Sequence, residues 1–260
     1  MKRSQSSIAE EYKQYARSQV MDSLGRAAHG SDYCGQTSSA TFHEISQRIA
    51  LWHLPREALL LDAGCGNGCF LLPLQKHFAI KAIGIDLSQD LIEKAKEKDI
   101  HSHCQFIQGD YANLPSEIPQ LDAIICIGSM YWNQSLETTL HCWSERLKEG
   151  GKCLIFLNVS ISPLTDEEQK RAGGTQFFIE KNLLEKIGHH LEITELLEEN
   201  ATYIAWLQKW CAGMDLYEED LVREFGEEFS KNMKIRFEAY LEFAKSGKTK
   251  RLIIESHKKG

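Results

Sequence analysis

The sequence predicts an α/β fold: a doubly wound, mostly parallel sheet of seven strands whose last strand runs antiparallel. The first observation is a series of short, nearly continuous apolar runs, which are typical of strands buried on both faces. The second is that segments with helical spacing separate these runs, as right-handed crossovers require. The expected strands are residues 58–63, 81–86, 104–108, 121–127, 152–158, 191–197 and 252–254.

The helices expected between these strands have recognisable starts and stops. Residues 69–77 follow the first strand, and Ser88 can cap the helix after the second strand. A helix over residues 135–147 is expected to stop at Gly150 and Gly151, before the next strand.

Helical segments also flank the expected core. Residues 10–24 near the start and the long segment 218–246 both show helical spacing. We expect a helical N-terminal cap segment (1–53), a core (54–198), a helical cover insertion (199–248), and a last core strand with a tail (249–260).

The composition of the 260-residue chain argues against several classes of protein. Charged residues make up 26% of the chain and the net charge is −7, so nothing indicates a nucleic-acid partner. No run of about 18 apolar residues exists, and no membrane span is expected. The polar first residues carry no secretory signal, and eight cysteines are too sparse for a disulfide scaffold. We expect a cytoplasmic protein with free thiols, acting as a monomer or homodimer.

The clearest motif is the loop Asp-Ala-Gly-Cys-Gly-Asn-Gly at residues 62–68, directly after the first strand. Its three glycines let the backbone approach a ligand closely, at the sheet edge where such folds bind ligands. A dinucleotide fingerprint would require glycine where Cys69 stands, and a phosphate-binding P-loop would require a lysine. The loop therefore favours a nucleoside ligand that has no pyrophosphate.

Acidic residues end the next two strands. Asp86 lies 22 residues after Gly64, where a carboxylate can accept hydrogen bonds from both ribose hydroxyls. Asp110 ends the third strand and could accept a hydrogen bond from an exocyclic amine, with Tyr111 against the base. These side chains indicate a nucleoside site at one edge of the sheet.

This combination resembles the class I S-adenosylmethionine-dependent methyltransferases, whose fold is Rossmann-like. The matching elements are the loop 62–68, Asp86, the Gly-Asp pair at 109–110, the strand at 121–126 and the segment 147–152. The resemblance covers residues 58–158, and its specificity comes from five elements in the family's order and spacing.

The resemblance implies a role for each matching position. The loop would surround the methionine part of S-adenosylmethionine, Asp86 would hold the ribose, and Asp110 would face the adenine amine, with Leu87 against the ring. The expected cofactor-binding residues are Asp62, Gly64, Cys65, Gly66, Asn67, Gly68, Asp86, Leu87, Asp110, Tyr111, Ile127 and Tyr15. The expected acceptor-site residues are Ser129, Met130, Tyr131, Trp132 and Tyr33. No catalytic residue is assigned.

Methyl transfer by such a protein depends mainly on proximity and orientation, because the sulfonium already makes the methyl group electrophilic. A general base is required only when the acceptor arrives protonated, so amine, hydroxyl, thiol and carbon acceptors all stay open. Cys65 and Cys69 straddle a glycine turn with no second pair at ligand spacing, and no metal is expected. The helical covers on both sides of the core favour a small-molecule acceptor.

Three alternatives stay open. The chain could keep the fold and bind the cofactor without turnover, as a regulator or adaptor. It could methylate a macromolecule, although residues 128–131 read Gly-Ser-Met-Tyr and lack the box typical of nucleic-acid amino-methylating enzymes. It could be a nicotinamide oxidoreductase, which Cys69 at the third glycine position disfavours.

Overall fold

A single twisted sheet runs through the molecule in the computed structural model, which describes residues 5–132, 135–175 and 177–260. The strand order is β3-β2-β1-β4-β5-β8-β7, and the short β6 pairs with β5 outside this path. The strands are β1 (Leu59–Ala63), β2 (Lys81–Asp86), β3 (Cys104–Gln108), β4 (Leu121–Ile127), β5 (Leu147–Ser160), β6 (Phe178–Ile179), β7 (Leu191–Glu198) and β8 (Thr249–Lys258).

The sheet confirms the predicted class, a mostly parallel α/β sheet with an antiparallel last strand. Strands β1 to β6 pair in parallel, and β8 runs antiparallel to both β5 and β7. The strand count differs by one, because the two-residue β6 is too short to leave a periodic apolar signal. The chain reverses its direction of growth between β1 and β4, so the carboxyl end of β1 lies at a topological switch point, where such sheets bind ligands.

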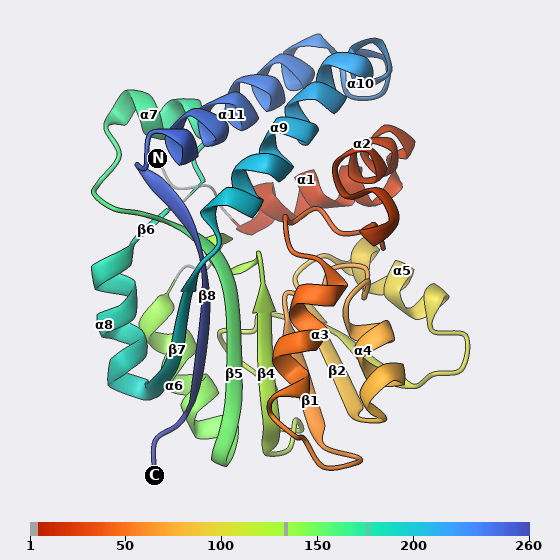
Figure 1. Ribbon diagram of the computed structural model, residues 1–260. Helices are drawn as coiled ribbons and strands as arrows, with labels where there is room; N and C mark the ends of the chain where they lie inside the picture. Colours follow the sequence, from red (N-terminus) through yellow and green to blue (C-terminus); the bar gives the residue numbers. More distant parts are fainter. Residues whose placement is uncertain (1–4, 133–134, 176) are drawn as a thin grey trace.

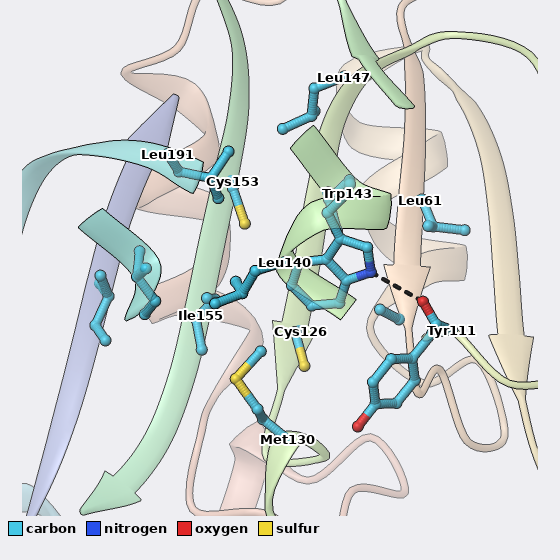
Figure 2. Packing of buried hydrophobic residues seen from close by; sticks show 14 of the residues in the cluster. Leu61, Tyr111, Cys126, Met130, Leu140, Trp143, Leu147, Cys153, Ile155 and Leu191 are labelled. Atoms are coloured by element: carbon cyan, nitrogen blue, oxygen red, sulfur yellow. Dashed lines mark hydrogen bonds between the residues drawn. The ribbon is translucent and has the colours of Figure 1, made fainter. Parts of the chain in front are cut away.

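Helices cover both faces of the sheet and bury its apolar side chains (Figure 1). On one face, α6 and α8 pack on the strands, and Trp143 of α6 is fully buried among them. Figure 2 shows its indole nitrogen donating a hydrogen bond to the Tyr111 carbonyl, at 3.0 Å. On the other face lie α3, α4 and α5. These helices are α3 (Phe42–Ala50), α4 (Leu71–Phe78), α5 (Gln89–Lys98), α6 (Leu136–Arg146) and α8 (Glu180–His190).

Helices from both flanks of the sequence gather at one end of the sheet (Figure 1). We call them the cover. Val20 and Leu24 of α2 pack in one cluster with Trp206 and Trp210 of α9, so the N-terminal segment and the insertion share a core. The cover helices are α1 (Gln5–Arg17), α2 (Gln19–His29), α9 (Asn200–Leu216), α10 (Glu218–Phe225) and α11 (Glu227–Lys245), and the short α7 (Asp166–Arg171) packs against α11.

Three expected helix boundaries are wrong. The helix expected over 10–24 is two helices, because Ser18 adopts an extended conformation and its side chain caps α2. The helix expected over 218–246 breaks at Gly226, whose φ of 85° is easily adopted only by glycine. Helix α6 ends at Arg146, and β5 begins at Leu147, before the glycine pair. Ser88 caps α5 as predicted.

The predicted boundaries of the cap, core, cover and tail segments stay a prediction. Among the described residues, the structure contains no helix with the length and apolar content needed to cross a lipid bilayer.

Candidate active site

A cavity of about 330 Å³ lies between the carboxyl ends of the parallel strands and the cover. This volume falls in the range of small-molecule sites. The predicted cofactor and acceptor residues that line it are Asp62, Gly64, Cys65, Gly66, Asn67, Asp86, Leu87, Asp110, Tyr111, Ile127, Tyr15, Tyr33, Ser129 and Tyr131. The structure thus brings fourteen of the predicted positions to one cavity.

The glycine loop makes a sharp turn at the end of β1. Gly64 has a φ of 85°, and its N–H donates to the Ile85 carbonyl of β2 at 2.8 Å. A Cβ atom on Gly64 would lie 2.4 Å from the Ser129 Cβ, so only glycine fits there. A Cβ atom on Gly66 would meet nothing within 4 Å, which leaves that part of the loop open to the cavity.

The assignment of Gly68 to cofactor binding stays a prediction. Gly68 is not among the residues that line the cavity. A Cβ atom there would lie 3.0 Å from the Phe106 ring. Gly68 therefore serves the close packing of the loop on the sheet.

Asp86 ends β2 directly beside the glycine loop. Its two carboxylate oxygens accept hydrogen bonds from the Gly66 N–H at 3.0 Å and from the Ser88 N–H at 2.9 Å. Burial raises the pKa of this carboxyl, while the two hydrogen bonds lower it. Each oxygen can accept a second hydrogen bond, and the side chain lines the cavity.

Asp62 lies at the end of β1 and is almost fully buried. Burial raises the pKa of its carboxyl to about 8, and the charge of Asp86 adds to this effect. A carboxyl with this pKa is mostly protonated at neutral pH. It becomes a carboxylate more readily when a cation enters the cavity that it lines.

Hydrogen bonds of Ser129 and Tyr111, which were predicted to line the ligand site, connect the ends of β1 and β4. Ser129 donates from Oγ to the Ala63 carbonyl at 2.7 Å, and the Tyr111 hydroxyl donates to the Ser129 carbonyl at 3.1 Å. Burial raises the pKa of Tyr111 well above its usual value. These two residues therefore hold the shape of the site besides lining it.

Among the described side chains, one predicted acceptor residue, Met130, does not line the cavity. Met130 is fully buried in the sheet core with Cys126 and Leu140 (Figure 2), because the 3₁₀ turn Met130–Trp132 directs its side chain inward. The Trp132 side chain lies outside the described residues. Tyr33 lines the cavity and donates to the Asp22 carboxylate at 2.6 Å.

Asn67 of the glycine loop holds the N-terminal segment against the loop. Its amide nitrogen donates to the Gly35 carbonyl at 3.0 Å, and its amide oxygen accepts from the Cys69 N–H at 3.2 Å. The segment around Gly35 therefore forms part of the rim of the cavity.

The cover supplies a charged triad that sequence reasoning missed. Arg236 of α11 pairs with Glu11 of α1 at 2.9 Å and donates to the Tyr15 hydroxyl at 2.8 Å. Tyr15 donates in turn to Glu11 at 2.5 Å. The Glu11 and Arg236 side chains are each only 11% exposed, and all three residues line the cavity. Tyr15 was among the expected cofactor-binding residues, but nothing in the sequence connects position 11 with position 236.

Aromatic side chains from distant segments complete the wall at this end. The Tyr131 hydroxyl accepts a hydrogen bond from the Asn158 N–H at 2.7 Å, and its ring lies 6.5 Å from that of Phe177. Among the missed residues, those from the cover are Tyr203, Trp206, Trp210, Phe237 and Tyr240. Their helical spacing was a visible signal, but it is equally typical of a core-facing stripe.

The described residues contain no group of three or more His, Cys, Asp or Glu side chains that could hold a metal ion.

Comparisons with known proteins agree with this geometry. Residues 60–151 match a family model described as a methyltransferase domain. The curated malonyl-[acyl-carrier protein] O-methyltransferase of Priestia megaterium is 34% identical over 113 residues, which is 43% of this chain and 41% of that protein. In the matched region the chain thus spans less than half the length of that relative.

Solved structures show the same fold over almost the whole chain. The cyclopropane synthase MmaA2 from Mycobacterium tuberculosis superposes with a TM-score of 0.80 at 14% identity, covering 96% of this chain and 98% of that one. A phosphoethanolamine N-methyltransferase 2 from Haemonchus contortus, solved with S-adenosyl-L-methionine, superposes with a TM-score of 0.75 at 14% identity. The match covers 92% of this chain and 57% of that one. The family model thus identifies a methyltransferase domain over residues 60–151, and the solved structures show the fold of almost the whole chain.

Proposed function

We propose that this protein transfers a methyl group from S-adenosylmethionine to a small-molecule acceptor. The observation that carries the proposal is that the glycine loop and the Asp86 carboxylate form one wall of a cavity whose other wall is the aromatic cover. A nucleoside site and an acceptor site in one enclosed space are what such a transfer requires.

The residues present fit the proposed cofactor. Gly66 leaves open space beside the loop, and both Asp86 oxygens keep an acceptor position for a ribose hydroxyl. Leu87 and Asp110 line the same part of the cavity and would contact the adenine, while Asp62 and the loop would hold the methionine part. When bound, the cofactor supplies a methyl group already activated by its sulfonium.

The remaining work of the chain is to position the acceptor and to exclude water. Tyr131, Phe177 and Tyr240 provide an aromatic wall from three separate segments. Orientation of this kind can supply about 7–11 kcal/mol of a reaction barrier. The proposal therefore needs no dedicated general base, and it includes nitrogen, oxygen, sulfur and carbon acceptors.

The cover helices limit the size of the acceptor that can enter the cavity. Helices α1, α9 and α11 contribute residues to the cavity, so a folded macromolecule would have to displace them. A cavity of about 330 Å³ instead suits a metabolite-sized molecule. One structural neighbour supports a small acceptor, because it is named a phosphoethanolamine N-methyltransferase. We also propose a cytoplasmic location, since all eight cysteines are free thiols. A monomeric or homodimeric state is part of the same proposal.

The binding half of the proposal is tested by titrating S-adenosylhomocysteine into the protein calorimetrically. We expect saturable binding, and we expect Asp86→Asn to weaken it about 10- to 100-fold, because about 1.5–3 kcal/mol of charge-assisted hydrogen bonding is lost. Glu97→Gln, on the exposed side of α5, is the matched control and should bind normally. Unchanged binding by Asp86→Asn would refute the ribose assignment.

The transfer half is tested with methyl-labelled S-adenosylmethionine and fractionated cell metabolites. We expect one low-molecular-weight fraction to gain label in proportion to enzyme. If label enters only protein or nucleic acid, the small-molecule proposal fails. If cofactor binds and no fraction gains label, the protein is a binding regulator instead.

A further inference from the structure

Six aromatic rings that line the cavity contact one another in a continuous series. They come from α9, from α11, from the residue before β6 and from the turn after β4. Neighbouring ring centroids in the series lie between 5.0 and 6.5 Å apart. In order of contact, the members of this ring series are Trp206, Trp210, Phe237, Tyr240, Phe177 and Tyr131. The side of the cavity proposed for the acceptor is therefore lined mainly by ring carbon atoms.

The hydroxyls of the two tyrosines in the ring series make hydrogen bonds within the protein. The Tyr131 hydroxyl accepts from the Asn158 N–H at 2.7 Å. The Tyr240 hydroxyl donates to the Ala172 carbonyl at 3.2 Å and also bonds the Thr175 hydroxyl. Both tyrosines thus contribute to the apolar lining through their rings.

Two guanidinium groups border the ring series, and each has a carboxylate partner. The Arg236 Cζ lies 5.7 Å from the centroid of the Phe237 ring, and the guanidinium pairs with Glu11 at 2.9 Å. Arg251, which lines the same cavity, is only 2% exposed and pairs with Glu44. The two positive and two negative charges cancel, so neither guanidinium is left to neutralise a charged ligand.

The lysines that line the cavity belong to a different part of it. Lys94 and Lys98 are on α5, the helix that follows Asp86. A Cβ atom on Gly35 would lie 3.1 Å from the Asn67 Nδ2 and 3.4 Å from the Lys98 Nζ. The Lys98 ammonium is therefore beside the glycine loop, on the side proposed for the cofactor.

A cationic acceptor fits the ring series poorly. A cation binds over the face of an aromatic ring, within about 6 Å of its centroid. Tyr240 meets Phe237 at 69° and Phe177 at 82°, so ring edges cover ring faces along the series. The Arg236 guanidinium already lies near the Phe237 ring and would repel a second cation.

We propose that the methyl acceptor is an uncharged, largely apolar molecule that packs against the ring series. This inference rests on the proposed function, because it names the class of acceptor for the same cavity. Burial of apolar surface against the rings stabilises such a complex. Burial of a charge that has no partner is costly, so charged molecules of the same shape are excluded.

The test compares three probes of nearly identical shape that differ in charge: naphthalene-2-carboxamide (neutral), naphthalene-2-carboxylate (negative) and naphthalene-2-carboxamidine (positive). Each probe is titrated calorimetrically into protein saturated with S-adenosylhomocysteine, which occupies the cofactor side. We expect the carboxamide to bind at least about tenfold more tightly than either charged probe. Equal or tighter binding of a charged probe, or no binding of the carboxamide, would overturn the proposal.

The variant Glu11→Gln tests whether charge pairing causes the selectivity. It leaves the Arg236 guanidinium without its carboxylate partner, so we expect the affinity for the carboxylate probe to rise at least about tenfold. The affinity for the carboxamide should change by less than about twofold, which also shows that the cavity is intact. Glu242→Gln is the matched control, because it breaks the exposed pair with Arg171 at a position that is not among those lining the cavity. An unchanged affinity of Glu11→Gln for the carboxylate probe would count against the proposal.

The variant Phe177→Ala tests whether the probe contacts the ring series. Phe177 lies outside the helices and strands, so its truncation should leave the melting temperature of the protein nearly unchanged. We expect the carboxamide to bind at least about fivefold more weakly, because ring contact is lost. Full affinity in this variant would place the probe elsewhere and overturn the proposal.

Binding of S-adenosylhomocysteine is measured before any probe is added. If it does not bind, the proposed function itself fails at this first step. If it binds and the probes do not follow the expected order of affinity, only the inference about the acceptor fails.

Discussion

The carboxyl edge of the sheet and the cover form opposite walls of one cavity, but their residues come together in different ways. At the sheet edge, the glycine loop and Asp86 belong to neighbouring strands whose register the sheet fixes. In the cover, Glu11 meets Arg236 across almost the whole sequence. The sheet-edge wall is thus built by neighbouring strands, whereas the cover wall depends on contacts between residues far apart in the sequence.

The largest expected effect is on the sheet edge. In Gly64→Ala the new methyl group would meet Ser129, and the backbone would keep a φ of 85° that alanine rarely adopts. We expect a loss of about 2–5 kcal/mol in the free energy of unfolding, from overpacking and backbone strain together, and no detectable binding of S-adenosylhomocysteine. Urea denaturation and calorimetry measure the two effects.

Gly66→Ala is the matched control for that prediction. Its φ of 54° is also positive, but its new methyl group would face open space. We expect only the backbone penalty of about 1 kcal/mol in stability. Equal destabilisation by the two substitutions would mean that contact with Ser129 does not shape the turn.

The next effect concerns the cover. Arg236→Met leaves the Glu11 carboxylate without its charged partner in a mostly buried place, and breaking a buried pair costs about 3–5 kcal/mol. Because the side chains are still 11% exposed, we expect the free energy of unfolding to fall by only about 2 kcal/mol. Hydrogen exchange should accelerate in α1 and α11 but not in the sheet.

The double variant Glu11→Gln with Arg236→Met sharpens the comparison, since it removes both charges. It should recover most of the lost stability in a double-mutant cycle. Additive losses would show that the pair does not hold the cover, and faster exchange in β1 would show that the two walls unfold together.

The two walls are expected to respond to pH with opposite signs. Burial lowers the pKa of His29 in the cover to about 4, where its ring accepts from the Trp206 N–H at 2.8 Å. Because unfolding lets this ring take up a proton, stability is lost as pH falls from 6.5 toward 4. The raised pKa of Asp62 has the reverse effect: the folded chain keeps a proton that the unfolded chain releases, so stability falls as pH rises from about 4 toward 8.

Melting temperatures of the wild type, His29→Gln and Asp62→Asn from pH 4 to 8 separate these contributions. Each contributes at most about 1.4 kcal/mol per pH unit. We expect His29→Gln to lose the decline on the acid side and Asp62→Asn to lose the decline between pH 6.5 and 8. Parallel profiles for all three proteins would contradict both assignments.

The sequence predicted the sheet edge better than the cover for physical reasons. Strands buried on both faces leave continuous apolar runs, and a glycine turn leaves a motif, so β1 to β5 and the loop were located correctly. The breaks at Ser18 and Gly226 depend on single backbone conformations within otherwise periodic stretches. Met130 was assigned to the cavity by its position after β4, but one turn of 3₁₀ helix turns its side chain into the core.

In the candidate site, too, residues at strand ends could be predicted and residues joined by long-range packing could not. Asp62, Asp86 and the loop could be found because the two acids lie at the ends of apolar strands and the loop follows β1 directly. Arg236 could not, because its partners Glu11 and Tyr15 are specified only by how α1 packs against α11. Single sequences carry no signal for a pair separated in this way.

The proposed function depends most on the bend after β1 and the carboxylate ending β2, which together would bind S-adenosylmethionine. Hydrogen exchange with and without S-adenosylhomocysteine, run beside NADH, tests it most directly. We predict slower exchange at residues 62–68 and 84–88 with S-adenosylhomocysteine and no change with NADH. Protection by NADH alone, or S-adenosylhomocysteine protection confined to segments outside these two, would contradict the account.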